Sequence, residues 1–509
     1  MKFGSIAAGN KTTVQSARDI LECGGNAFDA AVGAVFTSMV SEFTLTGPGG
    51  GGAFLAYPNG KEPILFDFFV DTPPPQPNKD LNFFSILIDF GPAKQEFHIG
   101  QGSVAVPGNT AGLLTVHERL GKLPLKTVLE PAIETARKGV ILNESHGYLM
   151  KILDPILTHS SSGKKLFTQK GKILKEGDNF QNPAFADFLE ELIIHGTDFF
   201  YKGSGAKLIL ETFGQKGLLT PECLANYEVI ERIPLKIDFH DKTFYTNPVP
   251  SIGGTLIAFT LQLIENSRFS FDMDVPGLIH AIQVTAVARK ETSIDPNDNY
   301  RIAQVLNESV FGKFLEKYIS RRTLDKTEKD LPSSGATTQV SIIDKAGNAA
   351  SVTTTNGAGC GYLIPEMGIM LNNMLGEEDL NPSGFHNFVR QQRLPTMISP
   401  SVVMGNDGPE LVLGSGGSSR IRSAILQVIL NYFMKEMSLK EAIRSPRIHL
   451  EGNVFHWEPG IQIPKSNELP DGIQFHEWDE QNLFFGGVNA VTPTEAVGDM
   501  RRGGTGIVC

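Results

Sequence analysis

Apolar residues near the start of the chain recur at spacings of three and four, a pattern typical of helices. Residues 13–23 fit such a helix, and Asn26 then stands where it can cap a second helix that runs to about Ser41. The apolar stretch Ala27–Val40 contains Asp29 and is shorter than the roughly 20 residues that cross a bilayer. We therefore expect a buried helix there and no membrane span.

The pattern is mainly helical over a lobe at about 110–230, in segments such as Thr110–Leu120 and Leu125–Lys138. Ala53–Tyr57, before this lobe, is strand-like. The segment after the lobe, Leu235–Tyr245, is expected to be a strand as well. Two further helices are expected at Leu256–Glu265 and Gly277–Lys290.

A polar segment separates this part of the chain from a β-rich part. Residues 321–336 are charged and then small, with one proline, which is the composition of an exposed linker. Two β-patterned runs follow, Thr337–Ile343 and Ala349–Thr355, and the five residues between them predict a hairpin. If Ile343 and Ala349, which flank the loop, pair with each other, Thr337 lies opposite Thr355 with both side chains on one face of the hairpin. The alternative is that these threonines are present only because β-branched residues suit strands.

A glycine-rich turn further along suggests a second part of a reactive site. The strand-like Glu410–Leu413 runs into Gly414–Ser419 and then into a helix. Such a turn can aim backbone N–H groups at a developing oxyanion, helped by the helix dipole. A plain tight turn is an alternative, and so is a phosphate cradle, although the P-loop lysine is absent. The earlier loop Gly49–Gly52 lacks dinucleotide-binding spacing, and we interpret it as structural.

Composition narrows the function classes. The 509 residues carry a formal net charge of -11, which argues against a non-specific nucleic-acid binder. The four cysteines are too far apart for a CxxC metal pair, so we expect no metal site of that kind. The first residues lack the apolar stretch of a signal peptide, and we expect a cytoplasmic protein.

Motifs along nearly the whole chain resemble the gamma-glutamyltransferase family of N-terminal-nucleophile hydrolases. They are GGNAFDAAV at 24–32, GPGGGGAF at 47–54, VPGNTAG at 106–112, PSIGGT at 250–255, TTQVSIIDKAGNAASVT at 337–353, GIMLNN at 368–373 and GSGGSSRI at 414–421. The resemblance implies an α+β fold, an αββα sandwich of two mainly antiparallel sheets between helical layers. It also implies a precursor cut between Ala336 and Thr337 into a large subunit, 1–336, and a small subunit, 337–509, which share one core.

The resemblance implies the reaction as well. The Thr337 hydroxyl attacks the preceding carbonyl, and the freed α-amine, with a reference pKa of about 7.7–8.0, then serves as its general base. Thr355 matches the family's second active-site threonine, which hydrogen-bonds the nucleophile. Gly416 and Gly417 fall in the oxyanion loop, although the family's glycine pair aligns best with Gly417 and Ser418. No metal or organic cofactor is implied.

The substrate pocket departs from the family pattern. Asn356 is next to the position of a substrate-binding asparagine, and Glu377 matches the acidic partner of the substrate α-amine. Asn78 stands near where an arginine should hold the glutamyl α-carboxylate, and Thr396 takes the place of one of two serines. Methionines replace two other polar residues, Met374 and Met397. We expect glutamyl recognition to be weaker by roughly 2–5 kcal/mol, because one desolvated charge pair is lost.

The leading hypothesis is an autoprocessed hydrolase or transferase that cleaves a γ-glutamyl or related acyl amide, such as glutathione, through an acyl-Thr337 intermediate. Water or an amine is the acceptor, and the two subunits of the precursor are each other's partners. One alternative is an acylase of the same fold with glutaryl or other acyl specificity. Another is a catalytically silent binding protein. Homo-oligomerisation stays open.

Overall fold

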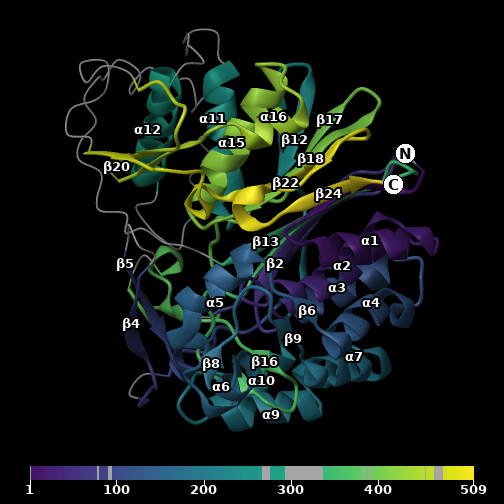
Figure 1. Ribbon diagram of the computed structural model, residues 1–509, viewed down its shortest axis with the longest axis vertical. Coiled ribbons are helices and arrows are strands. Elements are labelled where there is room, and N and C mark those ends of the chain that lie inside the picture. Colours follow the sequence, from purple (N-terminus) through teal and green to yellow (C-terminus); the bar gives the residue numbers. More distant parts are fainter. Residues whose placement is uncertain are drawn as a thin grey trace.

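The computed structural model describes residues 2–76, 79–89, 94–265, 275–292, 336–381, 384–388, 391–452, 454–463 and 474–509. Two antiparallel sheets are stacked in the middle of the molecule, and helices cover the outer face of each (Figure 1). This order of layers confirms the predicted αββα sandwich of the α+β class.

The first sheet joins segments from both ends and the middle of the chain. Among the described residues it has seven strands in the order β10-β3-β2-β14-β13-β1-β24. Their bounds are β1 Gly4–Ala8, β2 Gly51–Tyr57, β3 Ile64–Phe68, β10 Ile230–Arg232, β13 Thr337–Asp344, β14 Ala349–Thr355 and β24 Thr505–Val508. All neighbouring pairs are antiparallel. The hairpin β13–β14 is therefore central, held by β1 on one side and β2 on the other.

The second sheet lies against the first and has the order β11-β12-β17-β18-β22-β23 in the described part of the chain. Its bounds are β11 Leu235–Phe239, β12 Lys242–Thr246, β17 Ser401–Gly405, β18 Gly408–Gly416, β22 Gly487–Val491 and β23 Ala496–Val497. The prediction of one strand over Leu235–Tyr245 was wrong. The segment is a hairpin that turns at His240, whose backbone takes a φ of 51°. Alternation continues on both sides of this turn, so periodicity alone did not show it.

Helices α1 (Lys11–Glu22) and α2 (Ala27–Ser41) cover the first sheet, and α4 (Leu125–Lys138) packs against α2. Asn26 caps α2 as predicted, because its side chain accepts the Asp29 N–H and its own N–H donates to the Asp29 carboxylate at 3.0 Å. Every residue of α2 is buried. None of the described helices is long and apolar enough to cross a membrane.

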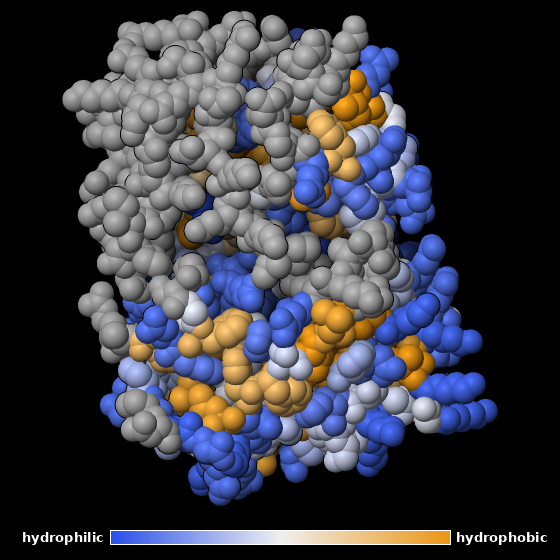
Figure 2. Space-filling view, turned by 90° about the vertical axis from the view of Figure 1, so that its left-hand side faces the viewer, coloured by the Kyte–Doolittle hydropathy of each residue, from blue (hydrophilic) through white to orange (hydrophobic). Residues whose placement is uncertain are grey.

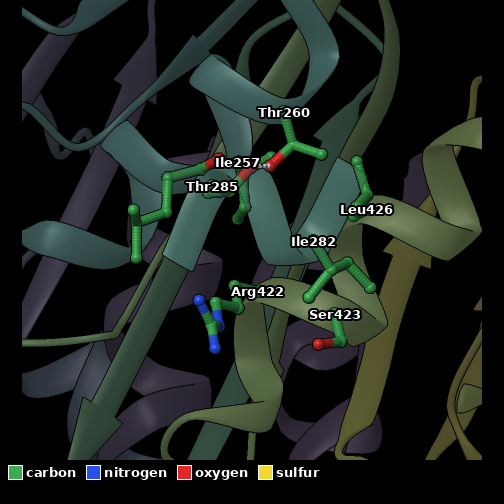
Figure 3. Close-up of a pocket in the computed structure, with 8 residues that line it drawn as sticks. Ile257, Thr260, Ile282, Thr285, Arg422, Ser423 and Leu426 are labelled. Carbon is green, nitrogen blue, oxygen red and sulfur yellow. Dashed lines mark hydrogen bonds between the residues drawn. The ribbon is translucent and has the colours of Figure 1, made fainter. Parts of the chain in front are cut away.

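The second sheet has its own helical cover, formed by α11 (Ile252–Glu265), α12 (Val275–Thr292), α15 (Arg420–Phe433) and α16 (Leu439–Arg444). α11, α12 and α15 meet at a cavity of about 10 Å³. Thr260 and Thr285 face each other there, with their hydroxyls 2.8 Å apart (Figure 3). This space is about the size of one water molecule, so it is no substrate site.

The helical lobe lies beyond the first sheet (Figure 1). Its remaining helices are α3 Asn109–Leu120, α5 Glu144–Leu157, α6 Ser161–Phe167, α7 Pro183–His195, α8 Thr197–Tyr201, α9 Ser204–Phe213 and α10 Pro221–Ala225. A hairpin of β4 (Phe84–Asp89) and β5 (Lys94–Ile99) flanks the lobe. In the view from the side of this hairpin, apolar residues form several surface patches that are separated by hydrophilic residues (Figure 2).

Candidate active site

The site is built around the start of the central strand β13. Thr337 pairs with Thr355 across the hairpin, which confirms the predicted register. Both side chains are more than nine-tenths buried. On its other edge β14 pairs Thr355 with Gly51. A methyl group on the preceding Gly50 would lie only 2.0 Å from the Thr355 carbonyl oxygen, so the four-glycine loop lets β2 approach this strand closely.

The Thr355 hydroxyl is directed at the bond that the sequence marks for cleavage. It donates to the carbonyl oxygen of Ala336 and accepts the Gly357 N–H at 3.1 Å. A hydroxyl has one proton to donate, so in this arrangement Thr355 hydrogen-bonds the carbonyl before Thr337. The resemblance had implied a hydrogen bond to the nucleophile itself. A donor at this oxygen stabilises the negative charge that develops when the carbonyl carbon is attacked.

Polar side chains between the two sheets fix the hairpin. Gln339 donates from Nε2 to the hydroxyls of Ser341 and Ser351, both at 2.9 Å, and accepts the Thr353 hydroxyl at 2.5 Å. Asn489 on β22 donates to the Gln339 carbonyl oxygen at 2.9 Å. Sequence reasoning missed this network, although polar residues at alternate positions of a buried strand were a usable signal. The network anchors the strand that begins with Thr337.

The predicted glycine-rich turn lies directly beside Thr337. It joins the end of β18 to the start of α15, and β18 packs against β13. A methyl group on Gly416 would lie 2.1 Å from the Thr337 carbonyl oxygen. Gly417 has a φ of 126° and Ser418 a φ of 51°, and the latter is uncommon for a residue with a side chain. The turn therefore brings a helix N-terminus, the positive end of its dipole, close to Thr337.

We expect Gly416→Ala to lower turnover by at least about 100-fold, because the added methyl displaces the loop from Thr337. Steady-state kinetics with an anilide donor measure this change. Gly47→Ala is the matched control, since its methyl would lie 3.6 Å from the Asn356 side chain, an ordinary contact. Equal activity of the Gly416 variant and the control would show that the loop does not act on the reaction.

Two acidic residues, Glu377 and Asp379, lie at the other side of the turn. Glu377 is between the short helices η2 (Met374–Gly376) and η3 (Glu378–Leu380), and Asp379 is in η3. The Ser418 hydroxyl donates to Asp379 at 2.9 Å. Glu377 lies beside Gly357, where a methyl group would be 2.4 Å from its Oε1, and the Gly357 N–H donates to the Thr355 hydroxyl. That oxygen has no hydrogen-bond partner among the described residues. Burial, followed by the charge of Asp379, raises the pKa of Glu377 to about 8.

The other residues predicted to contact the substrate do not all lie at the hairpin. The Asn356 amide donates to the Met370 carbonyl at 3.1 Å, and its Oδ1 has no partner in the described part of the chain. Thr396 is engaged near the start of α11, where its hydroxyl accepts the Ile398 N–H at 3.2 Å. Asn78 lies outside the described residues. The structure thus brings Asn356 and Glu377 to the hairpin and gives Thr396 other contacts.

A buried carboxyl group contacts the opposite face of β13. It was not predicted from the sequence. Glu42, at the end of α2, accepts the Thr338 hydroxyl and the Thr13 hydroxyl, the latter at 2.7 Å. Burial raises the pKa of Glu42 to about 7. No group of three or more His, Cys, Asp or Glu side chains in the described ranges could hold a metal ion. The groups that the hairpin and the turn bring together are hydroxyls, backbone donors and carboxyls.

Stacked αββα layers, a threonine at the start of a central strand and a glycine-rich helix N-terminus beside it define an N-terminal-nucleophile hydrolase. The family model described as gamma-glutamyltranspeptidase matches residues 13–509, and the chain belongs to that family. It is therefore an enzyme of the hydrolase and transferase type.

Curated relatives are similar over most of their length. The "Glutathione hydrolase proenzyme" of Escherichia coli (strain K12) is 30% identical, covering 95% of this chain and 86% of that protein. The protein of the same description from Pseudomonas aeruginosa is 28% identical, covering 99% of this chain and 94% of that protein.

Among solved structures, cephalosporin acylase from Bacillus halodurans has the same fold, with a TM-score of 0.81. It is 21% identical, and the match covers 99% of this chain and 96% of the acylase. Gamma-glutamyltranspeptidase from Pseudomonas nitroreducens, complexed with L-DON, is 28% identical with a TM-score of 0.52. That match covers 61% of this chain and 92% of the solved chain.

Proposed function

We propose that the chain cuts itself between Ala336 and Thr337 and then cleaves γ-glutamyl amides such as glutathione through an acyl ester on Thr337. Water or an amine accepts the acyl group. The observation that carries this proposal is the hydrogen bond from the Thr355 hydroxyl to the Ala336 carbonyl, at the start of β13. It prepares that one peptide bond for attack by the hydroxyl next to it.

Self-cleavage needs only groups on this chain and one water. The Thr337 hydroxyl oxygen attacks the Ala336 carbonyl carbon, and the oxyanion is stabilised by the Thr355 hydroxyl. The C–N bond then breaks, the amine takes the hydroxyl proton, and an ester joins Ala336 to the Thr337 side chain. Water hydrolyses the ester, leaving a carboxylate on Ala336 and a free α-amine on Thr337.

The freed amine accepts the Thr337 hydroxyl proton as the oxygen attacks the substrate amide. The new oxyanion is stabilised by the turn at Gly417 and Ser418, at the N-terminus of α15. The leaving amine takes the proton, and the acyl group stays on Thr337 as an ester. Water or a second amine then releases it, which gives hydrolysis or transfer.

A γ-glutamyl donor fits the acid that faces the hairpin. Glu377 has an oxygen without a partner among the described residues, next to Gly357, which lies two residues along the chain from Thr355. A buried carboxylate needs a cation or several donors, and a substrate ammonium group would supply both. This supports a donor with an α-amino group over glutaryl and other amine-free acyl groups.

An acylase specificity is the second candidate, and a different observation favours it. Residues 71–80 contain no arginine, and Met374 and Met397 stand where polar substrate contacts are expected. Both methionines are buried. A donor that lacks one of the glutamyl head groups would need fewer of these polar contacts.

Comparing γ-glutamyl and glutaryl p-nitroanilide separates the two candidates, because the donors differ by the α-amino group. We expect Glu377→Gln to lower kcat/KM about 10- to 100-fold for the γ-glutamyl donor alone, since a hydrogen bond to a charged group contributes about 1.5–3 kcal/mol. Glu378→Gln, an exposed neighbour, is the matched control. Equal losses for both donors, or a wild type that prefers glutaryl, would favour the acylase.

The same pair of donors has a distinctive pH dependence. The Glu377 carboxyl is neutral below its pKa, which burial raises to about 8, and binds an ammonium group only when charged. The ratio of kcat/KM for γ-glutamyl over glutaryl should therefore rise with pH through about 8, and stay flat in Glu377→Gln. Titration of the Thr337 amine cancels in this ratio because both donors use it.

A further inference from the structure

One arginine near the nucleophile differs from its neighbours in having no acidic partner. Three of the arginines around the end of β22 and the start of α15 pair with carboxylates: Arg420 with Glu451 at 3.7 Å, Arg447 with Asp499 at 2.7 Å and Arg501 with Glu458 at 2.5 Å. Arg502, in η6 (Met500–Arg502), forms no ion pair with any acid of the described residues. The acid whose charge acts on Arg502, Asp499, is itself bonded to Arg447 and Arg501.

The Arg502 side chain crosses to the turn beside Thr337. Its stem passes Gly487, where a methyl group would lie 2.5 Å from Cδ. A methyl on Gly416 would lie 3.4 Å from Nη1 and 2.1 Å from the Thr337 carbonyl oxygen. A methyl on Gly417 would lie 3.3 Å from Nη2. The guanidinium group therefore borders both the backbone of Thr337 and the turn at Gly416 and Gly417.

Few of its donors are used. Nη2 donates to the Leu483 carbonyl oxygen at 3.2 Å, and Nε has no partner among the described residues. The side chain is only partly buried. Burial and the charge of Arg420, opposed in part by the charge of Asp499, lower the pKa of Arg502 to about 10, which still leaves it charged at neutral pH. A partly exposed guanidinium with spare donors can still take up an anion.

We propose that Arg502 binds a carboxylate of the substrate at the edge of the oxyanion loop. This rests on the acyl transfer proposed above and names a recognition group for it. Guanidinium suits the task because its planar fork matches a carboxylate with two parallel hydrogen bonds. Arg502 borders the loop at Gly416 and Gly417, whereas Asp379 contacts it at Ser418. The two sides of the loop thus carry opposite charges, and the Arg502 side suits a carboxylate.

The carboxylate can come from the acyl group or from the amine that leaves or accepts, and two matched pairs distinguish these sources. Glutaryl and butyryl p-nitroanilide differ by a carboxylate on the acyl side. Glycylglycine and glycylglycinamide differ by a carboxylate on the acceptor. We expect Arg502→Met to lower kcat/KM about 10- to 100-fold for the charged member of one pair and to change its neutral member little. For the same charged member, the kcat/KM of Arg502→Lys should lie between those of the wild type and Arg502→Met, because lysine keeps the charge but lacks the planar guanidinium.

Arg444→Met is the control, because Arg444 is exposed and contacts η6 through Met500. It should leave both pairs unchanged. Equal losses for charged and neutral members of both pairs would overturn the proposal and leave Arg502 a structural role. Thermal unfolding shows whether each variant is folded.

Calorimetric binding of glutarate and glycylglycine to an uncut Thr337→Ala chain, with and without Arg502→Met, needs no turnover. Loss of carboxylate binding would support Arg502 even if no donor is cleaved, whereas unchanged binding would contradict it. Failure of the proposed reaction would instead appear as a wild type that releases no anilide.

Discussion

A Thr337→Ala variant stays one uncut chain and releases no anilide from any donor that the wild type cleaves. The substitution removes the only hydroxyl that is covalently next to the Ala336 carbonyl, so the first step of self-cleavage has no nucleophile. It also removes the atom that would carry the acyl group. We expect turnover to fall by at least about 10⁴-fold, the scale seen when a catalytic nucleophile is deleted. Gel electrophoresis and initial rates measure the two effects.

Thr337→Ser is the matched control because it keeps a hydroxyl on the same carbon. It should still cut itself and turn over, although more slowly. Loss of cleavage in the alanine variant and its return in the serine variant assign the reaction to the hydroxyl. A Thr337→Ala chain that still splits before residue 337 would require a nucleophile elsewhere.

Thr355→Val slows self-cleavage by about 10²- to 10³-fold, the range expected for loss of one oxyanion donor. Valine keeps the size and branching of threonine, so β14 and its pairing with β13 and β2 are retained. What disappears is the hydrogen bond to the Ala336 carbonyl and the acceptor for the Gly357 N–H. The half-time of conversion from one chain to two, followed after synthesis, measures the effect.

Thr355→Ser restores the hydroxyl and should recover most of the cleavage rate. If the valine variant were cut as fast as the wild type, the hydrogen bond to Ala336 would have no part in cleavage. If the serine variant, which keeps the hydroxyl, were as slow as the valine variant, loss of the hydroxyl would not account for the slow cleavage.

Short sequence patterns were enough to predict several of the elements that form this site. The capping of α2 by Asn26 depends on residues three apart, and the pairing of Thr337 with Thr355 depends on one hairpin loop. The strand, turn and helix at Gly416 were likewise contained in one short segment. Each of these predictions needed no knowledge of distant parts of the chain.

Features that join distant segments could not be predicted in this way. Gln339 meets Asn489, and Gly416 meets Arg502, only because β13 packs against β18 and β22 of the other sheet. The hydroxyl of Thr338 finds Glu42 because α2 covers that face. The order of strands in each sheet is set by the whole core, which a one-dimensional pattern does not contain.

Intact mass and N-terminal sequencing of the purified wild-type protein test the central claim most directly. We predict two chains, residues 1–336 and 337–509, and a second chain that begins Thr-Thr-Gln-Val-Ser. A single chain of 55.4 kDa that persists on prolonged incubation across the neutral pH range, or a new N-terminus at any other residue, would contradict it.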